Sequence, residues 1–124
     1  MKKLLEWPKN KKIVAIDFDG TITIKDNRIW DAGISEYYTN DYFEENLPIT
    51  DWVRVNRSNM YLILWTCRYG KALEDAISFC ADIGISFDSI NENIVAFVSS
   101  NKVMADIYID DKSVNIYEVT NIRL

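Results

Sequence analysis

Polar side chains that could do chemistry follow three separate apolar runs of this 124-residue chain. The runs are KKIVAI, MYLILW and ADIYI, and the side chains after them are Asp17 and Asp19, Thr66 and Arg68, and Asp110 and Asp111. Continuous apolar runs are typical of parallel strands buried on both faces, and the carboxyl ends of such strands form a ligand crevice. The sequence therefore predicts that these residues, far apart along the chain, converge on one site.

The residue types indicate what that site could do. Converging carboxylates repel each other unless a cation neutralises them, and a ligand set of oxygens alone suits Mg²⁺. With its charge masked, Asp17 could attack a phosphoryl group, while Asp19, two residues on, could protonate the leaving oxygen and later activate water. Gly20 would let the backbone turn sharply and leave amides free for phosphate oxygens. We therefore expect hydrolysis of a phosphomonoester through an aspartyl-phosphate.

Composition argues against several other kinds of protein. The chain has no histidine, which removes Ser-His-Asp and Cys-His catalysis and imidazole metal ligands. Cys67 and Cys80, the only cysteines, lie in apolar patterns and are interpreted as buried thiols. The net charge of -5 argues against a nucleic-acid partner, and no apolar run reaches the length of a membrane span. The basic start has too short an apolar segment for a signal peptide, so we expect a cytoplasmic protein without membrane partners.

The surrounding pattern predicts an α/β fold, a three-layer Rossmann-like sandwich with a central parallel sheet, in a single domain over 1–124. Residues 69–84 have a helical apolar stripe that ends at Gly84, and a second helix is expected to start near Thr50. A short strand is predicted over 85–90 and a weaker one over 115–119, while 91–100 could be helix or loop.

Residues 27–49 are irregular and form a short insertion that we interpret as a lid. Its aromatic side chains, among them Trp30 and Tyr38, could be either a satellite core or a platform for substrate. The acidity of the insertion disfavours a polyanionic strand, because carboxylates beside phosphates raise the cost of binding. A small phosphorylated substrate, such as a nucleotide or a sugar phosphate, is the expected partner.

The motifs DFDGT, LILWTCR and ADIYIDD together resemble the haloacid dehalogenase (HAD) superfamily of aspartate-nucleophile phosphohydrolases. By position, the resemblance implies that Asp17 is nucleophile and metal ligand, that Asp19 is the acid/base and offers its carbonyl to Mg²⁺, and that Thr66 orients the phosphoryl group. It also implies metal binding by Asp110 and Asp111. Lys102 is the candidate for the lysine that pairs with the phosphate charge, and Arg68 is the alternative cation.

Many members of that superfamily carry a cap domain, for which this chain has no room, so a capless or minimally capped phosphatase is implied. Its open crevice would then suit a large substrate or be completed by a second copy of the chain in a homo-oligomer. A receiver domain, which accepts a phosphoryl group on aspartate without rapid turnover, is the alternative. Receivers place their acidic pair at the first strand, whereas here the adjacent acids follow the last one.

Overall fold

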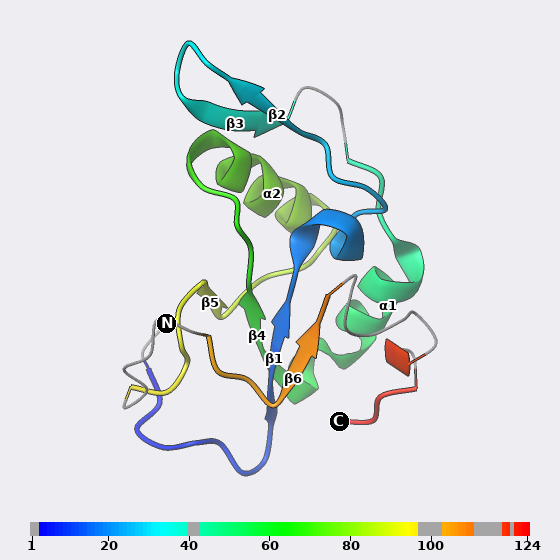
Figure 1. Ribbon diagram of the computed structural model, residues 1–124. Coiled ribbons are helices and arrows are strands. Elements are labelled where there is room, and N and C mark those ends of the chain that lie inside the picture. Colours follow the sequence, from blue (N-terminus) through cyan, green and yellow to red (C-terminus); the bar gives the residue numbers. More distant parts are fainter. Residues whose placement is uncertain (1–2, 40–42, 97–102, 111–117, 120) are drawn as a thin grey trace.

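A parallel sheet of four strands forms the centre of the molecule. The computed structural model describes residues 3–39, 43–96, 103–110, 118–119 and 121–124. The strand order is β5-β4-β1-β6, with β1 spanning Lys12–Ile16, β4 Met60–Leu64, β5 Ser89–Ile90 and β6 Ile107–Ile109 (Figure 1). The chain moves outward from β1 to β4 and β5, then returns to pair β6 with the other side of β1. This reversal is the kind of switch point at which open α/β sheets bind ligands, and it lies at β1.

Alternate side chains of β1 and β4 bury the two faces of this sheet in two hydrophobic clusters. Val14, Ile16 and Leu62 belong to the larger cluster, to which helices α1 (Leu47–Asn56) and α2 (Gly70–Asp82) contribute Trp52 and Cys80. The opposite face holds the smaller cluster, whose buried members are Ile13, Ala15, Ile63, Ile94, Val95 and Val103. Burial on both faces explains why these strands read as continuous apolar runs and confirms the predicted α/β fold.

The two α-helices largely follow the predicted pattern. Helix α2 buries Ala72, Ala76 and Cys80, and the chain leaves it through Gly84 with φ of 79°. Helix α1 begins at Leu47, three residues before the predicted Thr50, because Pro48 fits the first turn of a helix, where its missing N–H costs nothing. Neither of these helices is long and apolar enough to cross a membrane, and the same holds for every helix in the described ranges.

Several weaker predictions differ from the structure. The strand expected over 85–90 is confined to β5, and β6 is shorter than the predicted 105–111. The strand expected over 115–119 is wrong for Glu118 and Val119, which are helical, while 115–117 lie outside the described residues. Within 91–96 the chain is a loop that pairs Val95 with Leu4. Val119 is fully buried, so this end of the chain is fixed by side-chain packing instead of by the sheet.

The insertion between β1 and α1 forms a two-stranded antiparallel hairpin, with β2 spanning Arg28–Asp31 and β3 Glu36–Thr39. In Figure 1 it projects beyond the sheet, above the start of α2. Glu36 Oε1 accepts a hydrogen bond of 2.8 Å from the Lys71 backbone N–H, a position where a helix N-terminus favours a carboxylate. A Cβ on Gly70 would lie 1.4 Å from that oxygen, so only glycine allows this approach. The hairpin is thereby fastened to α2.

Candidate active site at the carboxyl edge of the sheet

Strand register brings the predicted residues from β1, β4 and β6 to one edge. Ile16 pairs with Leu64 on one side and with Ile109 on the other. The Asp17 N–H donates to the Ile109 carbonyl at 2.9 Å, and the Trp65 N–H donates to the Ile16 carbonyl at 2.8 Å. Both ladders therefore extend one residue beyond the strands. Asp17 and Asp110 follow paired positions on neighbouring strands about 4.8 Å apart, and Thr66 leaves β4 at the same edge.

The backbone turns sharply immediately after Asp17. The short helical turn η1 (Phe18–Ile22) contains Gly20 at φ of 77°, in the left-handed region that glycine adopts without a steric cost. Asp17 Oδ1 accepts a 2.8 Å hydrogen bond from the Phe18 N–H, and the Gly20 N–H donates to Thr23 Oγ1 at 3.3 Å. The hydrogen bond from the Phe18 N–H thus fixes one carboxylate oxygen of Asp17. Contrary to its predicted use for phosphate, the Gly20 amide has a partner within the turn.

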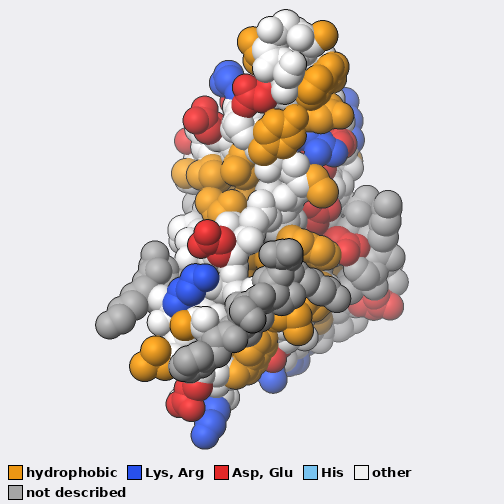
Figure 2. All heavy atoms as spheres, turned by 60° about the vertical axis from the view of Figure 1, so that its left-hand side comes forward, with side chains coloured by type: hydrophobic (Ala, Val, Ile, Leu, Met, Phe, Trp, Pro, Cys, Tyr) orange, Lys and Arg blue, Asp and Glu red, His pale blue; other side chains and the backbone are white. Residues whose placement is uncertain are grey.

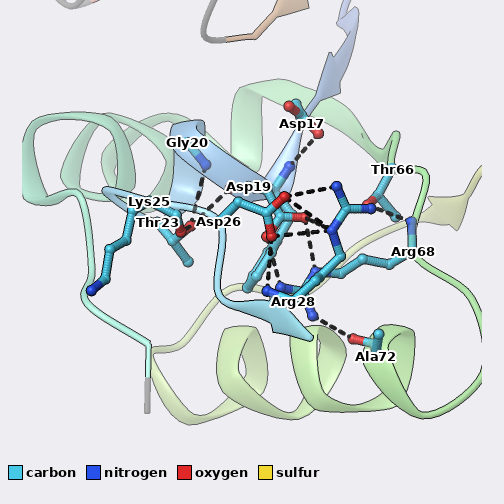
Figure 3. A network of polar contacts seen from close by, with 11 residues as sticks. Asp17, Asp19, Gly20, Thr23, Lys25, Asp26, Arg28, Thr66, Arg68 and Ala72 are labelled. Atoms are coloured by element: carbon cyan, nitrogen blue, oxygen red, sulfur yellow. Dashed lines mark hydrogen bonds and ion pairs between the residues drawn. The ribbon is translucent and has the colours of Figure 1, made fainter. Parts of the chain in front are cut away.

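Asp19 is held by Arg68, a residue 49 positions away in sequence (Figure 3). Arg68 Nε donates to Oδ2 of Asp19 at 2.9 Å and Arg68 Nη2 donates to Oδ1 at 2.7 Å, which makes the pair bidentate. The Arg68 side chain is 0% exposed and that of Asp19 is 10% exposed. The guanidinium packs over the rings of Phe18 and Phe43 and donates to the Ala72 carbonyl. Arg68 was predicted to contact substrate, but its side chain is buried against Asp19 and is not part of the cleft lining.

A second arginine approaches Asp19 from the hairpin. Arg28 Nε lies 3.7 Å from Asp19 Oδ2, and the Arg28 guanidinium makes shorter hydrogen bonds to both carboxylate oxygens of Asp26. The hydrogen bond to Arg28 lowers the pKa of Asp26, and the same bond raises the pKa of Arg28. Figure 3 shows the two arginines on either side of the Asp19 carboxylate. Asp19 is thus the point at which the lid-like hairpin meets the edge of the sheet.

An open cleft of about 480 Å³ adjoins these residues. Its lining comprises Asp17, Asp19, Gly20, Ile24, Lys25, Asp26, Arg28 and Cys67. No role was predicted for Lys25, Asp26 or Arg28, although they lie shortly after the DFDGT motif. Cys67 is exposed, so its interpretation as a buried thiol was wrong, whereas Cys80 is buried as expected. Cys67 is exposed because it lies three residues after the end of β4, outside the run of side chains that the sheet buries.

Thr66 and Thr21 occupy contrasting environments near this edge. The Thr66 N–H donates to Asn91 Oδ1 at 2.8 Å and Thr66 Oγ1 accepts from the Arg68 N–H at 3.1 Å, so its position is fixed from two sides. Asn91 comes from the turn after β5, which links the neighbouring strand to the edge. The Thr21 hydroxyl is buried and makes no hydrogen bond to the described residues. No hydrogen bond to a described residue therefore offsets the free-energy cost of burying this hydroxyl.

The donors at this edge fit a hard divalent cation. Asp17 and Asp110 directly follow paired positions of neighbouring strands, and the Asp19 carbonyl belongs to the turn after Asp17, so the candidate ligands are the oxygens that Mg²⁺ prefers. Asp111 and Lys102, the remaining predicted members of the site, lie outside the described residues. The part of the chain that is described contains no cluster of three acidic or cysteine side chains able to hold a metal ion.

Comparison with known proteins bears on the fold. No family model matches the chain, and no curated protein matches it significantly. The chain is similar to the solved structure of a conserved protein coded by a locus from Bacteroides thetaiotaomicron, with 26% sequence identity and a TM-score of 0.66. The match covers 90% of this chain and 88% of that one. The likeness extends over nearly the whole of both chains and shows an α/β, Rossmann-like fold built on a central parallel sheet.

Proposed function

We propose that this chain is a Mg²⁺-dependent phosphohydrolase of the HAD superfamily, which hydrolyses a phosphomonoester through an aspartyl-phosphate on Asp17. The observation that carries the proposal is the register of β1 with β6. It sets Asp17 beside Asp110 at the carboxyl edge, while η1 turns the backbone away immediately afterwards. A nucleophilic carboxylate needs a nearby cation to offset its negative charge, and it needs open space for the phosphoryl group. The cleft lined by Asp17 and Asp19 offers that space.

Asp17, Asp110 and the Asp19 carbonyl would hold the ion, which when bound offsets carboxylate charge and stabilises charge on the phosphoryl oxygens. In the first step an Asp17 carboxylate oxygen forms a bond to phosphorus, the bond from phosphorus to the ester oxygen breaks, and Asp19 gives that oxygen a proton. In the second step Asp19 takes a proton from water, the water oxygen bonds to phosphorus, and the bond to Asp17 breaks. Asp17 thus ends as the carboxylate and Asp19 as the protonated acid with which each began.

The pairing of Asp19 with Arg68 is compatible with this role. A bidentate guanidinium occupies one acceptor position on each carboxylate oxygen, and each oxygen keeps a second position for another partner. Asp19 also lines the cleft, so that second position is within reach of a bound ester. Arg68 then orients the acid/base, and substrate contact falls to residues of the cleft instead. Thr66, whose N–H donates to Asn91 and whose hydroxyl accepts from the Arg68 N–H, would orient the phosphoryl group.

Phosphate release distinguishes this proposal from a receiver-like phospho-acceptor. Steady release from p-nitrophenyl phosphate should require Mg²⁺ and should be lost in Asp17→Asn, which keeps the size of the side chain and removes its nucleophilic oxygen. Asp82→Asn is the matched control, because Asp82 is exposed at the end of α2, away from the cleft. Stoichiometric, long-lived phosphorylation without turnover would instead establish a receiver. Unchanged release from Asp17→Asn would overturn the proposed nucleophile.

A further inference from the structure

The hairpin exposes large apolar side chains next to the polar cleft. Trp30 is 50% exposed, and Tyr69, at the residue before α2, is 47% exposed. In Figure 2 the hairpin lies at the top of the molecule and carries hydrophobic side chains among a few charged ones. Single exposed apolar residues are common, whereas a group of exposed aromatic side chains beside a cleft is typical of a ligand-binding surface. Phe43 and Trp52, from the same aromatic-rich stretch of sequence, pack in the core instead.

Three aromatic rings contact one another in series beside the cleft, and we call them the aromatic shelf: Trp30, Tyr37 and Tyr69. Trp30 and Tyr37 are cross-strand partners in the hairpin, and their ring centroids are 5.1 Å apart. Tyr37 and Tyr69 are in edge-to-face contact at 6.5 Å. The rings therefore brace one another, and they leave about half of Trp30 and half of Tyr69 facing solvent. Rigid, partly exposed rings lose little conformational entropy when another ring packs on them.

Arg28 joins this shelf to the cleft. It lies two residues before Trp30 on β2, so both side chains project from the same face of the hairpin. The Arg28 guanidinium packs over the Tyr37 ring at 5.4 Å, lines the cleft, and reaches to 3.7 Å from Asp19. Cys67, which also lines the cleft, is two residues before Tyr69. Two residues of the cleft lining, Arg28 and Cys67, are therefore each two positions before a residue of the shelf.

We infer that the leaving group of the substrate carries an aromatic ring, as in a nucleoside monophosphate, and that this ring stacks on the aromatic shelf while the phosphoryl group lies at Asp17. The inference rests on the proposed phosphohydrolase function and names its substrate class. Stacking on an aromatic platform accepts any ring with a π-face and needs no hydrogen-bond code, which suits an open cleft without a cap. Arg28 beside the shelf adds a cation that an anionic ester would meet on entry.

Adenosine 5′-monophosphate and ribose 5-phosphate test the inference, because they share the phosphoryl group and the primary alkoxide and differ at the anomeric carbon, which carries adenine in the first and a hydroxyl group in the second. We expect KM for the nucleotide to be lower by about tenfold, the range that one stacked base contributes. Trp30→Ala should remove that difference by raising KM for the nucleotide to the value for ribose 5-phosphate. Trp30→Phe should retain most of the difference, since it keeps a ring at the position.

Ile29→Ala is the matched control, because Ile29 neighbours Trp30 on β2 but projects from the opposite face of the hairpin. It should leave the preference intact. Hydrolysis of both esters with equal KM, or a preference that survives Trp30→Ala, would overturn the shelf while the phosphohydrolase stands. Absence of phosphate release from either ester would instead contradict the proposed function. A loss of self-association in Trp30→Ala without a change in KM would assign the shelf to a second copy of the chain and overturn the inference.

Discussion

The carboxyl edge of the sheet and the β2–β3 hairpin meet at Asp19, but they hold it in different ways. From the edge, the Arg68 side chain is completely buried, pairs with Asp19 through two hydrogen bonds, and packs over two phenylalanine rings. From the hairpin, the Arg28 side chain is 25% exposed and lies 3.7 Å from Asp19, and it makes its shortest hydrogen bond to Asp26. The edge therefore holds Asp19 through a buried bidentate pair, and the hairpin holds it through a longer and partly exposed contact. The proposed chemistry belongs to the first region and the proposed selectivity to the second.

Removing each arginine should expose this contrast most strongly. Arg68→Ala leaves Asp19 nearly buried without its partner, and breaking a buried pair in this way costs about 3 to 5 kcal/mol. Arg28→Ala removes a partly exposed ion pair, which contributes less than about 1 kcal/mol. Urea unfolding of the two variants measures the difference. Equal losses would show that the two regions hold Asp19 with the same strength and would remove the basis of the comparison.

Gly70→Ala tests how the hairpin is fastened to α2. A methyl group there would overlap Glu36 Oε1, and φ of 54° is unfavourable for any side chain, so we expect a loss of about 2 kcal/mol. Gly84→Ala is the matched control, since Gly84 has φ of 79° with open space around it and should lose only about 1 kcal/mol. Gly70→Ala should also raise KM for an aromatic ester. Identical stabilities for the two variants would show that Glu36 does not anchor the hairpin.

The two cysteines sharpen the contrast between core and cleft. Burial raises the pKa of the Cys80 thiol from 9.0 to about 12, and the charge of Arg68 opposes that rise. Between these values the folded protein keeps a proton that the unfolded chain loses. Stability should therefore fall with rising pH, by at most about 1.4 kcal/mol per pH unit. Unfolding measured from pH 8 to 11 should show a shallower decline in Cys80→Ala. Parallel declines would contradict the shift.

In the native state a thiol reagent should modify Cys67, which is exposed in the cleft, well before Cys80. Mass spectrometry of the labelled peptides reads out the order of reaction. Simultaneous labelling of both thiols would mean that the core beneath the edge opens as readily as the cleft.

Thr21→Val should have the smallest effect on stability. The Thr21 hydroxyl is buried without a partner among the described residues, so an isosteric apolar side chain should be neutral or stabilising by up to about 1 kcal/mol. Thermal unfolding measures this, and a phosphatase assay in parallel asks whether a bound group uses the hydroxyl. A destabilisation of about 2 kcal/mol or more would show that the hydroxyl is satisfied in the folded protein.

The edge of the sheet could be predicted because its pattern is local and repeated. Continuous burial marks β1 and β4, and a polar residue after each run marks the point where the strand ends, so the convergence of Asp17 and Asp110 follows from parallel pairing. The pairing of Arg68 with Asp19 could not be read in this way. It depends on a three-dimensional approach of two loops, which no periodicity in either segment encodes.

The hairpin was harder to predict for a related reason. Its aromatic residues divide between the core and the surface, so a single interpretation of the stretch as satellite core or as platform could not describe both Phe43 and Trp30. The Glu36 contact requires glycine at 70, a signal that is visible only when the helix start and the hairpin are placed together. Helix α1 begins at Leu47 and not near Thr50, because proline at position 48 favours the first turn of a helix.

Acid-quenched single turnover with Mg²⁺ and a phosphomonoester, followed by peptide mass spectrometry, tests the central claim most directly. The account predicts a phosphoryl group on the peptide that contains Asp17, formed and lost within one turnover and absent from Asp17→Asn. A phosphoryl group mapped to another residue, or phosphate release that proceeds without any phosphorylated peptide, would contradict it.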